Sequence, residues 1–148
     1  MLVKILVLSV RFGLIILLFV LSIIDFKYKK IPIIPILIFI IGGLILRLTV
    51  LNGEDFWWVF ITSVTLIIYS LISKERFGMG DSLILTMIGC IEGLSTLIET
   101  MIASMIISLF GIFLICIFSI VKNKNYIKAN FPYVPCIFVG YIISLIYS

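Results

Sequence analysis

The sequence predicts an all-α fold, a polytopic membrane bundle of six transmembrane helices of which the fourth is short. Three observations lead to this fold class. Hydrophobic residues make up 64% of the 148 residues and charged residues only 12%, whereas a soluble domain is about 45–50% apolar and about 25% charged. The apolar residues gather in runs suited to crossing a bilayer, and the charges gather between these runs. We therefore expect residues 1–148 to form one integral membrane domain.

Six apolar runs define the predicted helices. A membrane span needs about 20 apolar residues, each of which adds about 1.5 Å of helix. The first run follows Lys4 but lacks an Ala-x-Ala-like end, so we interpret it as a retained span and not as a signal peptide. Trp57 and Trp58 open the third run, as expected for aromatic residues at a membrane interface. The runs cover residues 5–24, 32–50, 56–73, 83–94, 96–121 and 132–147.

The fourth run is short because the fifth begins early. Thr96-Leu97-Ile98-Glu99 matches a capping box, which predicts that the fifth helix begins at Thr96. About a dozen residues then follow Asp81, which gives roughly 18 Å of helix against a hydrocarbon core of about 30 Å. We therefore expect Asp81 to lie below the membrane surface. We also expect Gly78-Met79-Gly80 to be irregular backbone that lines a water-filled notch.

Lysine and arginine are concentrated in alternate breaks, which predicts the orientation of the helices. The positive-inside rule assigns the breaks rich in lysine to the cytoplasm and both termini to the outside. Asp25 and Asp81 then share the cytoplasmic face. The net charge of +4 does not indicate a nucleic-acid partner, because no basic stripe alternates with exposed aromatic residues. The breaks assigned to the cytoplasm contain Lys27, Lys29, Lys30, Lys74, Arg76, Lys122, Lys124 and Lys128, whereas the rest of the chain contains Lys4, Arg11 and Arg47.

Two of the seven acidic residues stand at the ends of apolar runs. Taken singly, Asp81 has the position of a helix N-cap and Asp25 that of an interfacial charge, although the dipole disfavours an anion at a helix C-terminus. Carboxylates at membrane depth are costly and by default indicate function. Together, the two could share one proton and hydrolyse a peptide bond with water. From the dipoles of their own helices we expect Asp81 to be mainly the ionised base and Asp25 mainly the protonated acid.

Glycines and prolines flank both aspartates. Gly78 and Gly80 are either turn residues or leave room beside Met79 for a substrate backbone. The prolines mark helix starts, and they would also hold stiff backbone beside the site. Those nearest to the predicted site are Pro32, Pro132 and Pro135.

The remaining polar residues receive structural interpretations. The three cysteines are isolated in apolar runs of a chain without histidine, so we read them as small buried hydrophobes and expect no metal and no organic cofactor. Arg11 is predicted to pair with Glu92 or Glu99, or to extend to the interface. The small residues of the last two runs indicate packing faces and not a serine nucleophile. These cysteines and small residues are Cys90, Cys116, Cys136, Ser104, Ser108, Gly111, Gly140 and Ser144.

The motifs follow one another in a fixed order along the chain. They are Asp25 with Ile31-Pro32, then Gly78-Met79-Gly80-Asp81 with Gly89, then Pro132-x-x-Pro135 with Gly140. In this order, on six predicted helices, the chain resembles the type IV prepilin peptidase family of GxGD aspartyl proteases over essentially its whole length. Two positions depart from the family pattern, which commonly has Asn in place of Ile33 and often has Lys in place of Leu83.

The resemblance implies an activity, a substrate class and a location. It implies an aspartic-type endopeptidase with Asp25 and Asp81 as its catalytic residues. Its substrates would be type IV prepilins or pseudopilins of a pilus or protein-secretion system, cleaved at the cytoplasmic face of the cell membrane. No cysteine-rich domain precedes the first predicted span, so the chain resembles the short, peptidase-only forms without a methyltransferase region. No oligomeric state is predicted.

Three other functions fit parts of this pattern. An archaeal preflagellin peptidase would use the same chemistry on a different substrate. A small proton-coupled transporter could use Asp25 and Asp81 as proton sites. Transport sites tend to lie near the bilayer midplane, whereas these aspartates are predicted at one face. A non-catalytic assembly subunit would need neither aspartate for chemistry.

Overall fold

The computed structural model describes the backbone of residues 2–29, 31–49, 55–72, 78–122 and 132–147. These residues form six helices and no strand, which confirms the all-α prediction, and each predicted run corresponds to one helix. The boundaries differ from the predicted ones by up to four residues. The helices are α1 (Leu2–Tyr28), α2 (Ile33–Thr49), α3 (Phe56–Ile72), α4 (Met79–Glu92), α5 (Leu94–Lys122) and α6 (Val134–Tyr147).

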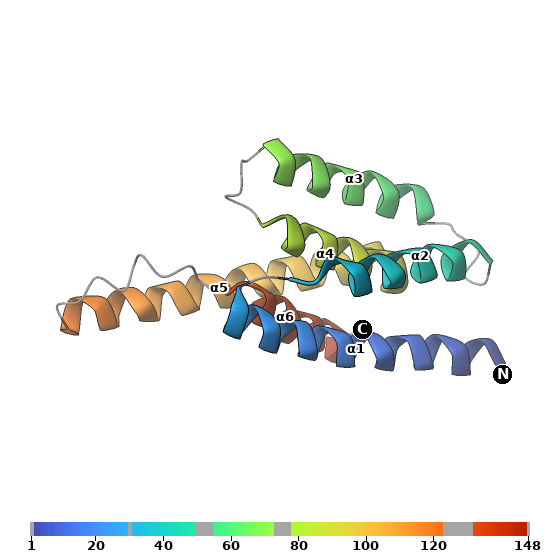
Figure 1. The fold of residues 1–148 in the computed structure, drawn as a ribbon. Coiled ribbons are helices and arrows are strands. Elements are labelled where there is room, and N and C mark those ends of the chain that lie inside the picture. The colour runs from blue at the N-terminus through green and yellow to red at the C-terminus, as the bar shows by residue number, and fades with distance from the viewer. Residues whose placement is uncertain (1, 30, 50–54, 73–77, 123–131, 148) are drawn as a thin grey trace.

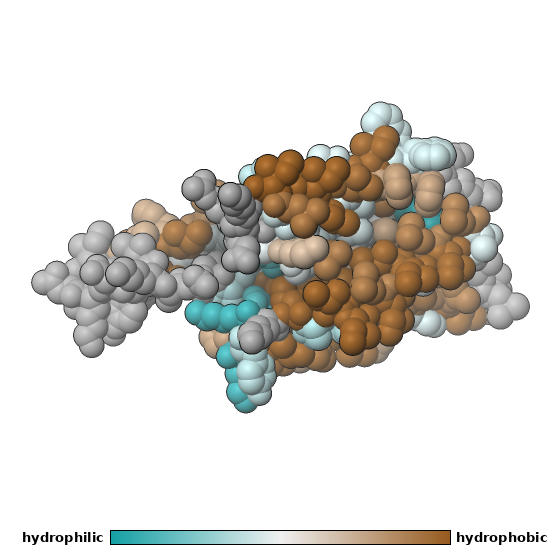
Figure 2. Space-filling model, turned by 45° about the horizontal axis from the view of Figure 1, so that its top comes forward, coloured by the Kyte–Doolittle hydropathy of each residue, from teal (hydrophilic) through white to brown (hydrophobic). Residues whose placement is uncertain are grey.

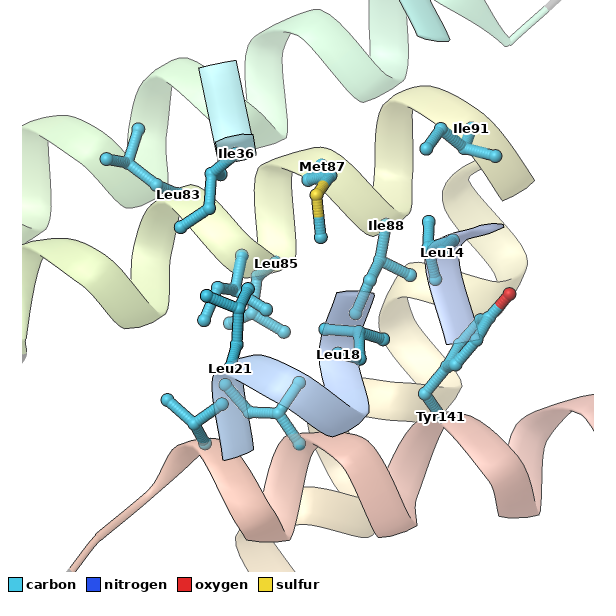
Figure 3. Packing of buried hydrophobic residues seen from close by; sticks show 13 residues of the cluster. Leu14, Leu18, Leu21, Ile36, Leu83, Leu85, Met87, Ile88, Ile91 and Tyr141 are labelled. Carbon is cyan, nitrogen blue, oxygen red and sulfur yellow. The ribbon is translucent and has the colours of Figure 1, made fainter. Parts of the chain in front are cut away.

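The short helix α4 lies in the middle of the bundle (Figure 1). Every residue from Ser82 to Ile91 is buried. Helices α2, α3 and α5 pack against α4, and α6 packs against α5 and α1. The core formed where they meet is shown in Figure 3, in which Leu14 and Leu18 of α1 lie near Ile88 of α4. The helix predicted to be too short for the bilayer is therefore covered mainly by protein.

The outer surface of the bundle is apolar. Two helices are long and apolar enough to cross a membrane, over Ile5–Tyr28 and Leu94–Ile117. Within the apolar 18-residue stretch of each, only 17% is buried in the first helix and 11% in the second. Helices α2, α3 and α6 are apolar but shorter. Figure 2 shows hydrophobic residues over most of the visible side of the bundle, with hydrophilic residues gathered toward its ends. A soluble fold would bury its long apolar helices, so this surface is suited to lipid.

The start of α4 differs from the prediction. The helix begins at Met79, and Gly78 is the N-cap residue, with φ −58° and ψ 130°. The N–H of Asp81 donates to the carbonyl oxygen of Gly78 over 3.0 Å. Asp81 therefore lies in the first helical turn and is not the N-cap, and the predicted irregular segment is reduced to Gly78. The reason is that the Gly78 carbonyl starts the helix without a side-chain cap.

The start of α5 also differs from the prediction. The helix begins at Leu94 and not at Thr96, because the chain turns at Gly93. Gly93 has φ 111°, a conformation that is readily available only to glycine. Its carbonyl oxygen accepts the N–H of Leu97 over 3.2 Å. One residue thus ends α4 and begins α5, and the capping box does not mark the helix start.

A buried carboxylate joins three helices at the C-terminal end of α4. Nη2 of Arg11 lies 2.7 Å from Oε2 of Glu92, whose side chain is 1% exposed. The Tyr141 hydroxyl donates to Oε1 of Glu92 over 2.8 Å, and Figure 3 shows this hydroxyl pointing toward the end of α4 that carries Ile91. Of the two partners predicted for Arg11, the structure selects Glu92. We call Arg11, Glu92 and Tyr141 the Glu92 clamp.

A second arginine binds the same end of α4. Nη1 of Arg47, on α2, donates to the carbonyl oxygen of Gly89 over 3.1 Å. Nη2 of Arg47 lies 2.7 Å from the point that a Cβ atom on Gly93 would occupy. Glycine is favoured at position 93 by its backbone conformation, and a larger residue there would also displace the Arg47 guanidinium group. A cation at the C-terminal end of a helix is favoured by the helix dipole. The sequence did not predict this role, because Arg47 was counted only for orientation.

Removing the Tyr141 hydroxyl should destabilise the bundle. The variant Tyr141→Phe keeps the ring but takes a hydrogen bond from buried Glu92, a loss of about 1–3 kcal/mol for a charged acceptor. The apparent melting temperature of the protein in detergent should fall. Tyr147→Phe is the matched control on the same helix, because Tyr147 is 85% exposed. Equal melting temperatures for the two variants would contradict the clamp.

Candidate functional site

Asp25 lies in the last turn of α1, with its side chain turned toward the start of α6. The residue is buried, and Oδ2 accepts the backbone N–H of Val134 over 3.3 Å. Its carbonyl oxygen accepts the N–H of Lys29, which has φ 51° and ends the helix. The carboxylate therefore links the C-terminal end of α1 to the N-terminal end of α6.

The N–H of Val134 is available because of the residues around it. The carbonyl oxygen of Tyr133 accepts the N–H groups of Cys136 and Ile137, over 3.0 and 3.1 Å. Pro135 has no N–H to donate. Val134 is the first residue of α6, so its N–H has no acceptor inside the helix, and it donates to Asp25 instead. The predicted site-shaping role of Pro135 stays a prediction.

Asp81 lies in the first turn of α4 and is half-buried. A Cβ atom on Gly78 would be only 2.7 Å from Oδ2 of Asp81, so this glycine leaves room for the carboxylate. The charge of Asp25 acts on Asp81, which means that the two predicted aspartates lie close together. Two neighbouring carboxyl groups share protons and titrate as a pair. The arrangement can therefore hold one acid and one base side by side.

Gly80 allows α4 to approach the segment that follows α1. A Cβ atom on Gly80 would collide with Cδ1 of Ile31 and would lie 3.1 Å from its Cβ atom. The sequence suggested that this glycine leaves room for a substrate backbone, but the Ile31 side chain fills that space. Pro32 follows directly and precedes α2. Met79, between the two glycines, is 50% exposed. The glycines thus shape the site from within the protein.

Tyr133 and Ser104 form a hydroxyl pair beside the aspartates. Their oxygens are 2.9 Å apart, and the hydroxyl of Ser104 also donates to the carbonyl oxygen of Met101 over 2.9 Å. Burial raises the pKa of the Tyr133 phenol; the hydrogen bond with Ser104 lowers it, and the charge of Asp81 raises it further. The phenol therefore stays protonated and lies within range of Asp81.

The sequence contained only a partial signal for this pair. Tyr133 stood inside the proline motif, and Ser104 was interpreted as a packing residue. The packing interpretation is confirmed, since a Cβ atom on Gly140 would be 2.9 Å from the backbone nitrogen of Ser104. Thr100 and Ser144 are hydrogen-bonded over 3.1 Å on the same interface. This close approach of α5 and α6 places Ser104 under Tyr133. Pro132 lies just before Tyr133 and outside the helix.

The three cysteines were predicted to be small buried residues. All three thiols are free, with Cys90 and Cys136 buried and Cys116 partly buried. The interpretation of the first two as small core residues is confirmed. Cys136 lies on the first turn of α6, near enough for its charged form to act on Tyr133.

One comparison with known proteins gave a match. The model of the type IV leader peptidase family matches residues 12–118. This segment includes both aspartates and both glycines of the Gly78-Met79-Gly80-Asp81 motif. Neither the curated proteins nor the solved structures gave a significant match. The start of α6, which supplies Val134 and Tyr133, lies beyond the matched segment.

The contact of Gly80 with Ile31 predicts a steric rescue. Gly80→Ala should lower the stability of the bundle by about 1–3 kcal/mol, because the new methyl group overpacks the contact. Ile31→Ala in the same chain should restore much of this loss by removing the opposing atoms. Gly42→Ala is the matched control, since a Cβ atom there meets nothing within 4 Å, and alanine favours helix. Unfolding midpoints in detergent test this; a neutral Gly80→Ala would contradict it.

Proposed function

Since the chain belongs to the type IV leader peptidase family, we propose that it is a membrane aspartyl endopeptidase in which Asp25 and Asp81 are the catalytic residues. One observation carries the proposal beyond the family. Asp81, on α4, lies within range of the charge of Asp25, on α1. Maintaining such a pair is costly for a fold, and it provides the acid and the base that hydrolysis of a peptide bond by water requires.

The pair hydrolyses the peptide bond without forming a covalent bond between enzyme and substrate. The ionised aspartate takes a proton from water, whose oxygen attacks the scissile carbonyl carbon. The protonated aspartate gives its proton to the carbonyl oxygen, which yields a neutral gem-diol. The first aspartate then protonates the leaving nitrogen while the second takes a proton from one gem-diol hydroxyl. The C–N bond breaks, a carboxylic acid and an amine leave, and the pair returns to its initial state.

The proposed substrates are type IV prepilins or pseudopilins. Such a substrate has a short basic leader that ends in glycine, followed by an apolar helix. The apolar surface of the bundle supports this assignment, because a substrate helix can lie in the bilayer beside the enzyme (Figure 2). Lys27 is exposed and would face the basic leader at the cytoplasmic surface. Salt in the surrounding water weakens the repulsion between these positive charges. A preflagellin peptidase differs in substrate alone, so a panel of both substrate types separates the two.

The chain is a membrane protein, and we propose that its six helices all belong to the membrane-embedded bundle of the cell membrane. Helices α1 and α5 have the length and composition of spans. Helices α2 and α3 have 17 residues each, about 25 Å, and Trp57 and Trp58 at the start of α3 are exposed as interfacial anchors would be. The excess of lysine near Asp25 supports an active site that faces the cytoplasm.

Both aspartates should be required for cleavage. Asp25→Asn and Asp81→Asn keep the shape of the side chains but remove one member of the acid–base pair, so kcat should fall by a factor of about 10²–10⁴ or more. The measurement is cleavage of a prepilin by membranes that contain each variant at equal amounts. Asp55→Asn is the matched control, because Asp55 is exposed, and it should retain activity. Near-normal cleavage by either dyad variant would exclude the aspartyl mechanism.

The proposed orientation predicts which positions react with membrane-impermeant thiol reagents. After the native cysteines are changed to Ala, a cysteine at Lys27 should react only from the cytoplasmic side and one at Asp55 only from outside. Labelling of both from one side would refute the topology. The expected cytoplasmic positions Glu75 and Asn125 and the outside position Asn52 lie outside the described residues.

A further inference from the structure

We propose that the interface between α3 and α4 contains a binding site for one water molecule, held by the side-chain hydroxyls of Ser63 and Thr86. Ser63 is 6% exposed and Thr86 is 5% exposed. Neither hydroxyl has a hydrogen-bond partner among the residues that the structure describes. The inference goes beyond the proposed function and does not depend on it.

These two hydroxyls differ from others on the same helices. A serine or threonine inside a helix can donate to a backbone carbonyl three or four residues earlier. On α3, the Thr62 hydroxyl makes such a bond over 2.8 Å. On α4, the Ser82 hydroxyl does so over 2.8 Å as well. Ser63 and Thr86 make no bond of this kind, so their hydrogens remain available to another partner.

The contacts between α3 and α4 place the two hydroxyls opposite each other. The helices pack together, and Figure 1 shows them side by side and running in opposite directions. Cγ1 of Val59, on α3, lies 3.5 Å from the point that a Cβ atom on Gly89 of α4 would occupy. Ser63 follows Val59 by about one turn, and Thr86 precedes Gly89 by about one turn. In antiparallel helices these two steps lead in the same direction, so Ser63 and Thr86 face each other.

The side of α4 that faces α3 carries small residues. Ser82, Thr86 and Gly89 are spaced by four and three residues, so they share one side of the helix. The side that carries Leu83 and Met87 belongs instead to the hydrophobic core. Small side chains allow a water molecule to fit between two helices. The facing hydroxyls supply two of the two to four polar partners that a buried water needs.

One water molecule can satisfy both hydroxyls. Each hydroxyl has one hydrogen to donate and lone pairs that can accept. Water can therefore accept the hydrogen of one hydroxyl and donate to the oxygen of the other. A buried hydroxyl without a partner is costly, above all in a bundle surrounded by lipid. The bridge replaces two such costs by hydrogen bonds that join α3 to α4.

The surroundings select a neutral ligand. Helix α3 contains no charged residue. The two acidic residues of α4, Asp81 and Glu92, lie in its first turn and at its last residue, whereas Thr86 lies in the middle of the helix. An ion between Ser63 and Thr86 would therefore have no counter-charge on either helix, and burying it would be far more costly than burying water.

A double-mutant cycle tests the bridge by the sign of its effects. Ser63→Ala and Thr86→Val each leave the other hydroxyl and the water with one partner fewer, so each should lower the apparent melting temperature in detergent by about 2–8 °C. The double variant should lose less than the sum of the two, because it removes both hydroxyls together. Thr65→Val is the matched control on the exposed side of α3, and its effect should simply add to that of Thr86→Val.

Two results of this cycle would overturn the proposal. If the hydroxyls are unpaired, removing either one takes away a buried polar group without a partner, and the melting temperature should rise. If each hydroxyl bonds only to its own helix, the effects of Ser63→Ala and Thr86→Val should be additive, as in the Thr65 control.

A crystal structure of the unaltered protein separates a bridging water from a direct contact. Density for an oxygen atom about 2.5–3.0 Å from both Oγ of Ser63 and Oγ1 of Thr86 is expected. A direct bond between the two hydroxyls, with no such density, would refute the water site. None of these measurements uses cleavage, so their outcome is independent of whether the chain is a peptidase.

Discussion

Helix α4 has 14 residues, as many as α6, but it is buried from Ser82 to Ile91, and most of the structure depends on how this short central helix is held. Such a helix is about 21 Å long, against a hydrocarbon core of about 30 Å. Its ends lie within the bundle, where unpaired polar groups are costly. Both ends of α4 must therefore find partners within the protein. At the C-terminal end, Arg47 donates a hydrogen bond to the Gly89 carbonyl oxygen. Arg11 and Tyr141 bind Glu92 at the same end. The N-terminal end carries Asp81 and meets Asp25.

The two ends of α4 are polar for different reasons. At the clamp, a charge pair and a phenol hydrogen bond join α4 to α1 and α6. At the other end, two carboxyl groups are brought together, which stabilising interactions alone do not explain. The clamp and the candidate site therefore lie at opposite ends of one buried helix.

The sequence predicted those features that depend on local pattern. Apolar runs and charged breaks were sufficient for six helices, and the intramembrane carboxylates indicated the site. Arg11 was limited to two partners, of which Glu92 proved to be the right one. The boundaries at Gly78 and Gly93 were missed because backbone carbonyls there start the helices, so no capping side chain is needed. Contacts between helices were missed as well, since helical periodicity does not identify the partner of Arg47 or the close approach of α5 to α6.

The surroundings of Asp25 show why an argument from a single helix is incomplete at this site. The dipole argument considered only the helix that carries each aspartate, α1 for Asp25 and α4 for Asp81. It failed to include a donor from a helix far away in sequence. That donor is free because it lies in the first turn of α6, where a backbone N–H has no acceptor within the helix, while the Tyr133 carbonyl accepts the N–H groups of Cys136 and Ile137. The start of α6 thus directs a backbone N–H at Asp25. This contact joins helices that are far apart in the sequence, so no pattern within α1 could indicate it.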